Sequence, residues 1–457
     1  MNPDPRGKTQ ESADRRFRSR RAFLQGGGLA GIGLQLPQLL AAQSGRGDVS
    51  KSRSCILLYA TGGPAQQETF DPKPEANDGY RGEFQPIATS VPGMQICELL
   101  PLMARQADKY AIIRSTFHGS NTHGVGVHYN LSGLKHAPRS QGEPQNSRLD
   151  PPSISGVMRQ LRGDRNGLPG AIHLPVRIGD QNNRQWAGQG AGLLGTSYDP
   201  LMLIEEAWQP GEMPPGFLPP ADVTLDRHRQ RANLLHGLNG QAATESTAVH
   251  GYNRYREQAL SILESKSAWE AFLLKDESPR MLDRYGHNKF GRSCLIARRL
   301  VEAGVSLVTV PWMHLHSTRN FDTHANHFTV MKDLLMPPVD QAFSALLEDL
   351  SERGLLDETL VVWTGEFGRT PRINKGAGRD HWGNVYSTVL AGGGIRGGQA
   401  YGSSDKVGGE PVDNPVHVRD LFATIYHALG FNHETKVFDP IGRPHFFMEG
   451  SVVEALV

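Results

Sequence analysis

Short apolar runs, each followed by a polar loop, constrain the fold of this chain most. The runs Cys55–Ala60 and Thr359–Thr364 contain no charged residue, which is typical of parallel strands that are covered on both faces. Between them, an amphipathic helix over Gly291–Ala303 precedes a strand over Val305–Val310, and a second helix runs from Pro337 to Gly354. This alternation predicts right-handed crossovers and an α/β fold with a mostly parallel sheet.

The loops after these strands are expected to lie together. Further strands are predicted at Tyr110–Arg114, Pro175–Ile178 and Val385–Leu390. Parallel strands end at one edge of the sheet, where open α/β sheets bind their ligands. Side chains from loops that are far apart in the sequence can therefore form one site.

Carboxylates and imidazoles are concentrated in these loops. Imidazole with carboxylate suits zinc, iron or manganese, whereas oxygen ligands alone would suit magnesium or calcium. We therefore expect one or two divalent metal ions. An Asp can also orient a neighbouring His without any metal, and this alternative stays open for Asp322 and His324. The candidate ligands are Asp71, Asp322, His324, Glu366, Asp380 and His381, with His327 as an optional member.

Two further positions are candidates for catalysis. Thr122 and His123 lie in a polar turn between a strand and a helix, where a hydroxyl nucleophile can sit beside backbone N–H groups. Thr122 could equally be a helix N-cap without chemistry. Arg369 could clamp a phosphate or sulfate oxyanion through two hydrogen bonds, or form a structural salt bridge with Glu366.

Charge and cysteine content exclude several classes of function. A formal net charge of +1 provides no field that would attract nucleic acid. The three cysteines lie far apart, so neither a disulfide framework nor a thiolate zinc site is expected.

The N-terminal segment is predicted to be an export signal. Arg20 and Arg21 precede Phe23-Leu24 and a weakly apolar stretch that ends near Leu40, a pattern that resembles a twin-arginine signal. The alternative, a short membrane anchor, is disfavoured because the stretch contains Gly, Gln and Pro. We expect a signal peptide over 1–42, a linker over 43–52 and one domain over 53–457 with a helical insertion at about 200–290. The twin-arginine machinery would deliver a mature chain without a stable membrane span to the periplasm or the extracellular space.

Several motifs together resemble a known family. They are Gly62-Gly63-Pro64, Thr69-Phe70-Asp71-Pro72-Lys73-Pro74, Asn121-Thr122-His123-Gly124, Asp322-Thr323-His324, Gly365-Glu366-Phe367-Gly368-Arg369-Thr370-Pro371 and Asp380-His381-Trp382. They resemble the exported bacterial domain-of-unknown-function family fifteen-oh-one, which is similar to the alkaline phosphatase and sulfatase superfamily. The resemblance implies a three-layer α/β/α sandwich, two metals and a Ser, Thr or formylglycine nucleophile.

The resemblance is uneven at the site. Glu366-Phe367 stands where the superfamily commonly has Asp-His, and no Cys begins a Cys-x-Pro-x-Arg segment, which disfavours a formylglycine sulfatase. The leading hypothesis is an exported metal-dependent hydrolase of small-molecule or glycan phosphate or sulfate esters, with Thr122 or a metal-bound water as nucleophile. The alternative is a non-catalytic exported protein that binds a metal or a glycan on the same fold.

Overall fold

The described part of the chain begins just after the predicted leader. The computed structural model describes residues 53–457, except 137–145, 181–184, 314–319 and parts of 205–259. The predicted signal peptide and linker therefore lie outside the described residues, as does much of the predicted helical insertion. None of the helices in the described ranges has the length and apolar character that a membrane span requires.

The first apolar run forms the central strand β1 (Ser54–Ala60). All residues of β1 are buried, as expected for a strand covered on both faces. It pairs in parallel with β7 (Leu307–Trp312) on one side and with β8 (Thr359–Thr364) on the other. The predicted strands at these positions are thus present, and β7 begins and ends two residues later than the predicted strand Val305–Val310.

The main sheet is mostly parallel. Its strand order is β12-β4-β11-β8-β1-β7-β5-β6, with β15 also paired to β4. Of the pairings in this sheet, only those of β11 with β4 and with β8 are antiparallel. The further strands are β4 (Tyr110–Phe117), β5 (Ala171–His173), β6 (Leu201–Met202), β11 (Tyr386–Ala391), β12 (Gln399–Tyr401) and β15 (Val416–His417).

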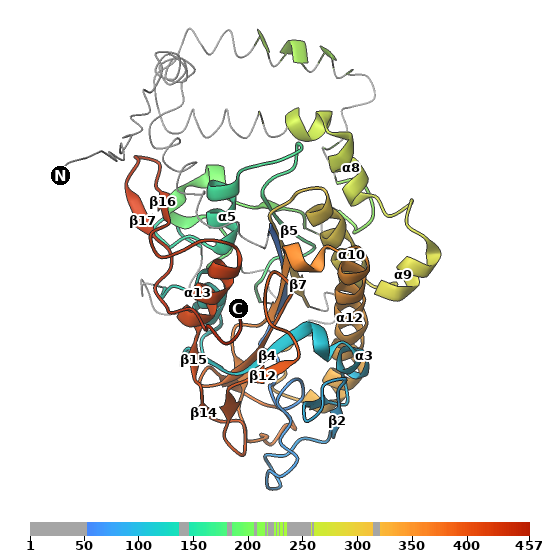
Figure 1. The fold of residues 1–457 in the computed structure, drawn as a ribbon, viewed down its shortest axis with the longest axis vertical. Coiled ribbons are helices and arrows are strands. Elements are labelled where there is room, and N and C mark those ends of the chain that lie inside the picture. Colours follow the sequence, from blue (N-terminus) through green and yellow to red (C-terminus); the bar gives the residue numbers. More distant parts are fainter. Residues whose placement is uncertain are drawn as a thin grey trace, which may run out of the picture. The chain divides into compact units, whose positions relative to one another are not determined.

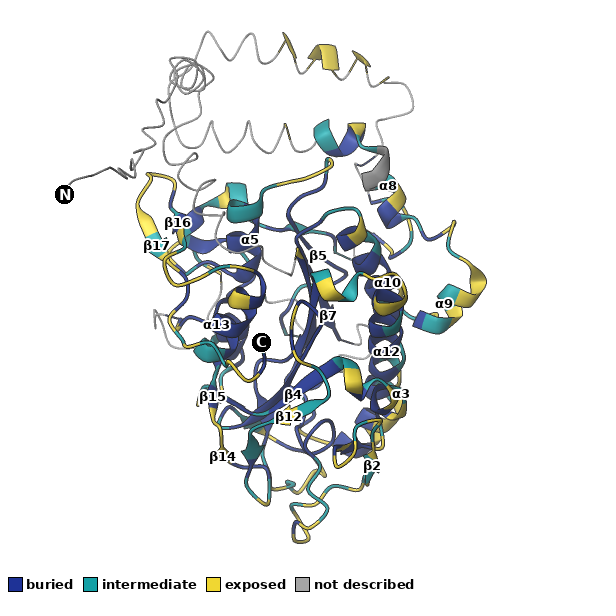
Figure 2. Ribbon diagram, viewed as in Figure 1, coloured by how far each residue is buried: buried dark blue, intermediate teal, exposed yellow. Residues whose placement is uncertain are grey.

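Helices cover both faces of this sheet. On one face, Ile56 and Leu58 of β1 pack in a core with α3 (Pro101–Arg105), α10 (Lys289–Glu302) and α12 (Met336–Glu352). On the other face, Leu57 and Tyr59 pack in a core with α4 (His123–Ser132), α5 (Ile154–Arg162) and α13 (Val418–Ala428). Figure 1 shows α5 and α13 to the left of the strands and α10 and α12 to the right, and Figure 2 shows the central strands buried. The predicted α/β/α sandwich is confirmed.

The remaining described elements are short. The helices are α8 (Lys266–Phe272), α9 (Pro279–Tyr285) and α11 (His327–Val330), and a π-helical turn at Met331–Leu335 connects α11 to α12. Separate two-stranded sheets are formed by β2 (Pro86–Ala88) with β3 (Gln95–Cys97), β9 (Gly368–Arg369) with β10 (His381–Trp382), β13 (Ser403–Ser404) with β14 (Pro411–Asp413), and β16 (Lys436–Phe438) with β17 (Pro444–Phe446).

Two strand predictions are wrong in detail. The strand predicted at Val385–Leu390 is β11, but it is antiparallel to both neighbours, so its C-terminal end lies at the edge opposite the site loops. No helix connects β8 to β11, and a parallel pairing would require such a crossover. The strand predicted at Pro175–Ile178 is absent because the paired residues are those of β5, just upstream, and Pro175 has no N–H to contribute to a ladder.

Candidate metal centre

The candidate site lies where four strands of the sheet end. His123 is the first residue of α4 and follows β4, while Asp322 and His324 follow β7. His381 begins β10, which pairs with β9 directly after β8. The loop after β1 provides the backbone of Gly62 on the remaining side. The parallel arrangement of β1, β4, β7 and β8 is therefore what brings these segments together.

Three imidazoles converge on the carboxylate of Asp322. Its Oδ1 lies 2.9 Å from Nε2 of His324 and 2.9 Å from Nε2 of His381. Its Oδ2 lies 3.4 Å from Nε2 of His123. The Nε2 atoms of His324 and His381 are themselves only 3.0 Å apart. All of these contacts use Nε2, so the rings present the same atom to one point.

The other nitrogen of each ring faces an oxygen acceptor. These contacts are His324 Nδ1 to Asp380 Oδ1 at 2.7 Å, His381 Nδ1 to the Asn121 carbonyl oxygen at 2.9 Å, and His123 Nδ1 to Glu366 Oε1 at 2.8 Å. A carbonyl or carboxylate oxygen only accepts, so each ring donates its proton from Nδ1. In a neutral ring the lone pair is then on Nε2. Metal-ligating histidines are oriented in this way by an oxygen on their second nitrogen.

This arrangement fits a bound cation. With lone pairs on Nε2 of His324 and His381 facing each other and a carboxylate oxygen, a positive ion relieves their mutual repulsion. The separations of about 3 Å are close to those between ligands of one ion with bonds of about 2.1 Å. Within the described ranges, His123, Asp322 and His381 are the group of three whose ligand atoms could hold a metal. Imidazole-rich donors with one carboxylate suit zinc, iron or manganese.

Arg369 stabilises the charge of Asp322. Burial alone would raise the pKa of the Asp322 carboxyl, but hydrogen bonds from His123 and His381 and the charge of Arg369 outweigh burial and lower that pKa far below its usual range. Burial also opposes protonation of His123, yet its hydrogen bonds to Asp322 and Glu366 raise its pKa to about 9. Without a metal, His123 therefore carries protons on both ring nitrogens at neutral pH, and a bound ion would displace the proton on Nε2.

Arg369 does not occupy the position of a substrate clamp. Its side chain is fully buried and donates from Nε to Gly63 O at 2.9 Å, from Nη1 to Arg379 O at 3.2 Å and from Nη2 to Asp322 Oδ1 at 2.7 Å. Nη2 also donates to Gly62 O. Arg369 forms a salt bridge with Asp322, whereas the alternative to a clamp considered from the sequence was a salt bridge with Glu366. An arginine with these contacts positions the loops and leaves little for an oxyanion.

Glu366 and Asp380 orient histidines. Glu366 is fully buried, and its Oε1 accepts from the N–H of Gly62 at 2.7 Å as well as from His123. In the described part of the chain, His324 lies between Asp380 and Asp322, with Nδ1 against Asp380 and Nε2 against Asp322. Both were predicted as direct ligands. One oxygen of each carboxylate contacts an imidazole, and the buried Oε2 of Glu366 has no hydrogen-bond partner among the described residues.

Asp71 lies apart from the metal centre, whereas Thr122 is next to it in sequence. Asp71 is buried in a separate group, with Oδ1 2.9 Å from Nζ of Lys73 and Oδ2 accepting from the hydroxyl of Ser404 at 2.5 Å. We therefore leave Asp71 out of the ligand group. Thr122 is the N-cap residue of α4, next to His123, but its hydroxyl makes no capping hydrogen bond.

A glycine permits the closest approach in the centre. Gly62 has φ +103°, and a Cβ added there would lie 2.3 Å from the backbone nitrogen of Asp322. Any side chain would both strain the backbone and displace the loop that carries Asp322. The Gly62-Gly63 pair is therefore required by the geometry of the site.

Two features of the site escaped sequence reasoning. The Trp186 ring stacks on the His123 ring, with centroids 4.3 Å apart and planes at 6°. Trp186 lies in a Gly- and Asn-rich excursion, where no pattern marks it. The second feature is a buried group of Glu68, His327 and Arg379, in which Glu68 Oε2 lies 3.0 Å from His327 Nε2 and Oε1 lies 2.7 Å from Arg379 Nη2. His327 thus belongs to this group, outside the ligand group.

Comparison with solved structures finds distant likenesses. The lipoteichoic acid synthase LtaP from Listeria monocytogenes is 8% identical, with 89% of this chain and 76% of that chain covered and a TM-score of 0.41. The PsFucS1 sulfatase from Pseudoalteromonas sp. is 12% identical, with 90% and 72% covered and a TM-score of 0.37. The phosphonate monoester hydrolase SpPMH from Silicibacter pomeroyi is 13% identical, with 88% and 76% covered and a TM-score of 0.36. Likenesses this distant carry no argument about chemistry.

Sequence comparison places the chain in a family. No curated protein matches it. The family described as "Protein of unknown function (DUF1501)" matches residues 52–457, which is nearly the whole chain after the leader and contains every residue of the metal centre. This confirms the resemblance found from the motifs: the chain belongs to the DUF1501 family.

Proposed function

We propose that this chain is a metal-dependent hydrolase of sulfate or phosphate esters, with a small molecule or a glycan as the esterified group. The observation that carries the proposal is the convergence of Nε2 of three histidines on the carboxylate of Asp322. A divalent ion held there, with zinc, manganese or iron favoured over magnesium or calcium, would polarise an ester oxygen and neutralise the charge that develops during hydrolysis.

Each residue of the centre has a role in this proposal. His123, Asp322 and His381 would hold the ion, and His324, whose Nε2 lies beside Oδ1 of Asp322 and Nε2 of His381, would be a further ligand. Glu366 and Asp380 keep two of the imidazoles in the required tautomer. The N-terminal N–H groups of α4, which begins at His123, would face an anionic sulfuryl or phosphoryl group.

The nucleophile is either Thr122 or water. The hydroxyl of Thr122 is not engaged in capping α4, so it can turn toward a substrate held beside His123. Water needs no special side chain and would attack without a covalent intermediate. Thr122→Ala separates these alternatives, since a water mechanism survives the substitution and a Thr122 mechanism does not.

One observation favours a second candidate, a non-catalytic protein that binds a metal or a glycan. All the polar groups of Arg369 are directed at protein atoms, so the site lacks the side-chain cation that sequence reasoning assigned to the oxyanion. Among the residues that the structure describes, the metal site and the N-terminus of α4 remain to provide that stabilisation in the enzyme proposal.

Metal analysis and a hydrolysis panel distinguish the two candidates. The purified mature chain is assayed for bound zinc, manganese and iron and for turnover of aryl sulfates, aryl phosphates and phosphodiesters. We expect turnover that Asp322→Asn and His381→Ala abolish, together with metal binding, while Asp357→Asn, an exposed carboxylate, changes neither. Bound metal without turnover on any ester supports the binding protein, and the absence of both refutes the metal centre.

We also propose export by the twin-arginine machinery to the periplasm or the extracellular space. The support is the Arg20-Arg21 pair ahead of a weakly apolar stretch. Fractionation of a bacterial host that expresses the full chain tests this proposal. Replacement of both arginines by lysine is expected to retain the chain in the cytoplasm, and unchanged export would contradict the proposal.

A further inference from the structure

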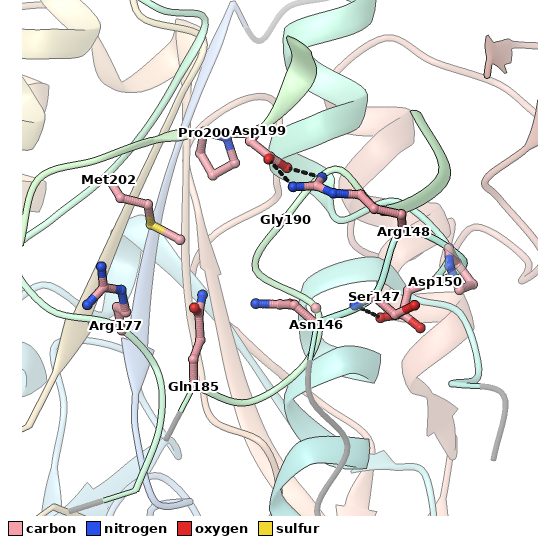
Figure 3. A pocket seen from close by; sticks show the side chains of 13 residues that line it. Asn146, Ser147, Arg148, Asp150, Arg177, Gln185, Gly190, Asp199, Pro200 and Met202 are labelled. Atoms are coloured by element: carbon pink, nitrogen blue, oxygen red, sulfur yellow. Dashed lines mark hydrogen bonds and ion pairs between the residues drawn. The ribbon is translucent and has the colours of Figure 1, made fainter. Parts of the chain in front are cut away.

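A cavity lies beyond the metal centre, at the same edge of the sheet. It has a volume of about 350 Å³, within the range of small-molecule sites. Met202, the last residue of β6, and Arg177, which follows β5, both line it. Since β5 and β6 are parallel to β7, these residues lie at the C-terminal ends of the outer strands. Figure 3 shows the side chains of Arg177, Met202, Gln185, Asn146 and Arg148 around this space.

A single segment separates this cavity from the metal centre. Gln185 lines the cavity, and the adjacent Trp186 stacks on His123 with ring centroids 4.3 Å apart. Gly188, also in the cavity wall, packs against α4 so closely that a Cβ would lie 2.7 Å from Cα of His128. In the sheet, β5 is the next strand after β7 and β6 the one after that, so they lie about 5 and about 10 Å from β7. A ligand bound at the metal centre would have to cross the Gln185–Gly188 segment along this edge to reach the cavity.

The charges in the cavity are balanced. Arg148 donates from Nη1 and Nη2 to Oδ1 and Oδ2 of Asp199, at 2.7 and 2.5 Å, and Asp199 Oδ1 also accepts from the N–H of Ala191 at 2.8 Å. The remaining charged lining residues are Arg177 and Asp150, one of each sign. An anion would face carboxylates here, so the cavity is poorly suited to a second sulfate or phosphate group.

Balanced donors and acceptors suit hydroxyl groups. A hydroxyl both donates and accepts, and it can bridge a guanidinium and a carboxylate that are already paired, such as Arg148 and Asp199. The amides of Asn146 and Gln185 add further groups of both kinds. A ligand with several closely spaced hydroxyls would therefore be complementary to this lining.

We propose that this cavity binds uncharged sugar units of a glycan whose sulfate or phosphate ester lies at the metal centre. The substrate class is then an esterified oligosaccharide rather than a small aryl or alkyl ester. The identification of the substrate rests on the proposed function, but the binding of sugar in the cavity does not require turnover.

Sugar binding is measured separately from hydrolysis. The probes are uncharged tetrasaccharides of glucose, xylose, mannose and galactose, titrated into the mature chain by calorimetry and by ligand-observed NMR. The same titration is done on Asp322→Asn, which disables the metal centre. Two variants change the cavity at one half-buried side chain: Gln185→Ala removes an amide and Gln185→Trp fills the space. Gln85→Ala, an exposed glutamine outside the cavity lining, is the control.

The expected result is binding of at least one tetrasaccharide by the wild-type chain and by Asp322→Asn. Gln185→Ala should weaken binding about three- to tenfold, as expected for one lost hydrogen bond, and Gln185→Trp should abolish it. Gln85→Ala should leave the affinity unchanged. The proposal is overturned if no tetrasaccharide binds at millimolar concentration. It is also overturned if both Gln185 variants bind the tetrasaccharide with the affinity of the wild-type chain. Sugar binding with no ester hydrolysis would sustain this inference while refuting the proposed enzyme.

Discussion

Replacement of Glu68 by Gln tests whether a buried ion pair fixes the loops beneath the metal centre. Glu68 is 1% exposed, and its carboxylate contacts Arg379 and His327 at 2.7 and 3.0 Å. Nδ1 of His327 lies 2.5 Å from the hydroxyl of Thr323, so Thr323 can donate to Nδ1 while Nε2–H donates to Glu68. The group therefore connects the loop after β1 to the residues that follow Asp322 and to Arg379, which directly precedes Asp380.

The magnitude follows from the acidity of Glu68. Burial alone would raise its pKa, but Arg379 and the hydrogen bond from His327 lower it from 4.5 to about 2. A difference of this size between the unfolded and folded chain corresponds to about 3 kcal/mol of stability at neutral pH. Because the folded pKa is the lower one, this contribution is complete above the unfolded pKa and is lost as the pH falls toward about 2. At pH 3.5 about 2 kcal/mol should remain.

The assay is urea denaturation of the wild type, Glu68→Gln and Glu75→Gln between pH 7 and pH 3.5. Glu75 is exposed and serves as the control. Glu68→Gln also leaves Arg379 buried without its carboxylate, so at pH 7 we expect a loss of about 3–5 kcal/mol. The difference from the wild type should narrow at low pH. A loss below about 1 kcal/mol, or a difference that does not depend on pH, would refute this account of the group.

Three further predictions concern the metal centre. Asp380→Asn should weaken metal affinity about 10- to 100-fold, because Asp380 orients His324; equilibrium dialysis measures this, with Asp357→Asn as control. Gly62→Ala should abolish metal binding, since its Cβ would clash with the backbone of Asp322, and unchanged metal content would contradict the described geometry. At a metal concentration 100 times Kd, the bound ion should add about 3 kcal/mol to the free energy of unfolding, so chelation should lower the midpoint temperature of thermal unfolding. An unchanged midpoint temperature argues against a bound ion.

The architecture could be predicted from the sequence because each buried strand is marked by its own apolar run. The run Cys55–Ala60 has no polar position, so it could only be a strand covered on both faces, and the structure buries every one of its residues. The direction of β11 was not encoded in this way. Its residues are equally apolar in either direction, and only the missing helix between β8 and β11 indicates the antiparallel pairing.

The site could be predicted as a group of loops but not as a set of individual roles. The convergence of Asp322, His324 and His381 follows from parallel strands that end at one edge. Whether a buried carboxylate contacts a metal or a histidine depends on distances of a few ångström between distant segments, which residue types do not specify. Glu366 and Asp71 are therefore where sequence reasoning and the structure differ most.

The π-helical turn between α11 and α12 fixes the direction that His327 faces relative to the core side of α12. From His327 onward the helix runs through this turn at Met331–Leu335 into α12, whose Val339 and Phe343 pack on the sheet. A π turn accommodates one more residue than an α turn, and each residue advances a helix by about 100°. The turn therefore lets His327 face Glu68 while the core face of α12 stays on the sheet. Deletion of a single residue there would rotate one of these faces away from its partner without changing any residue that either face uses.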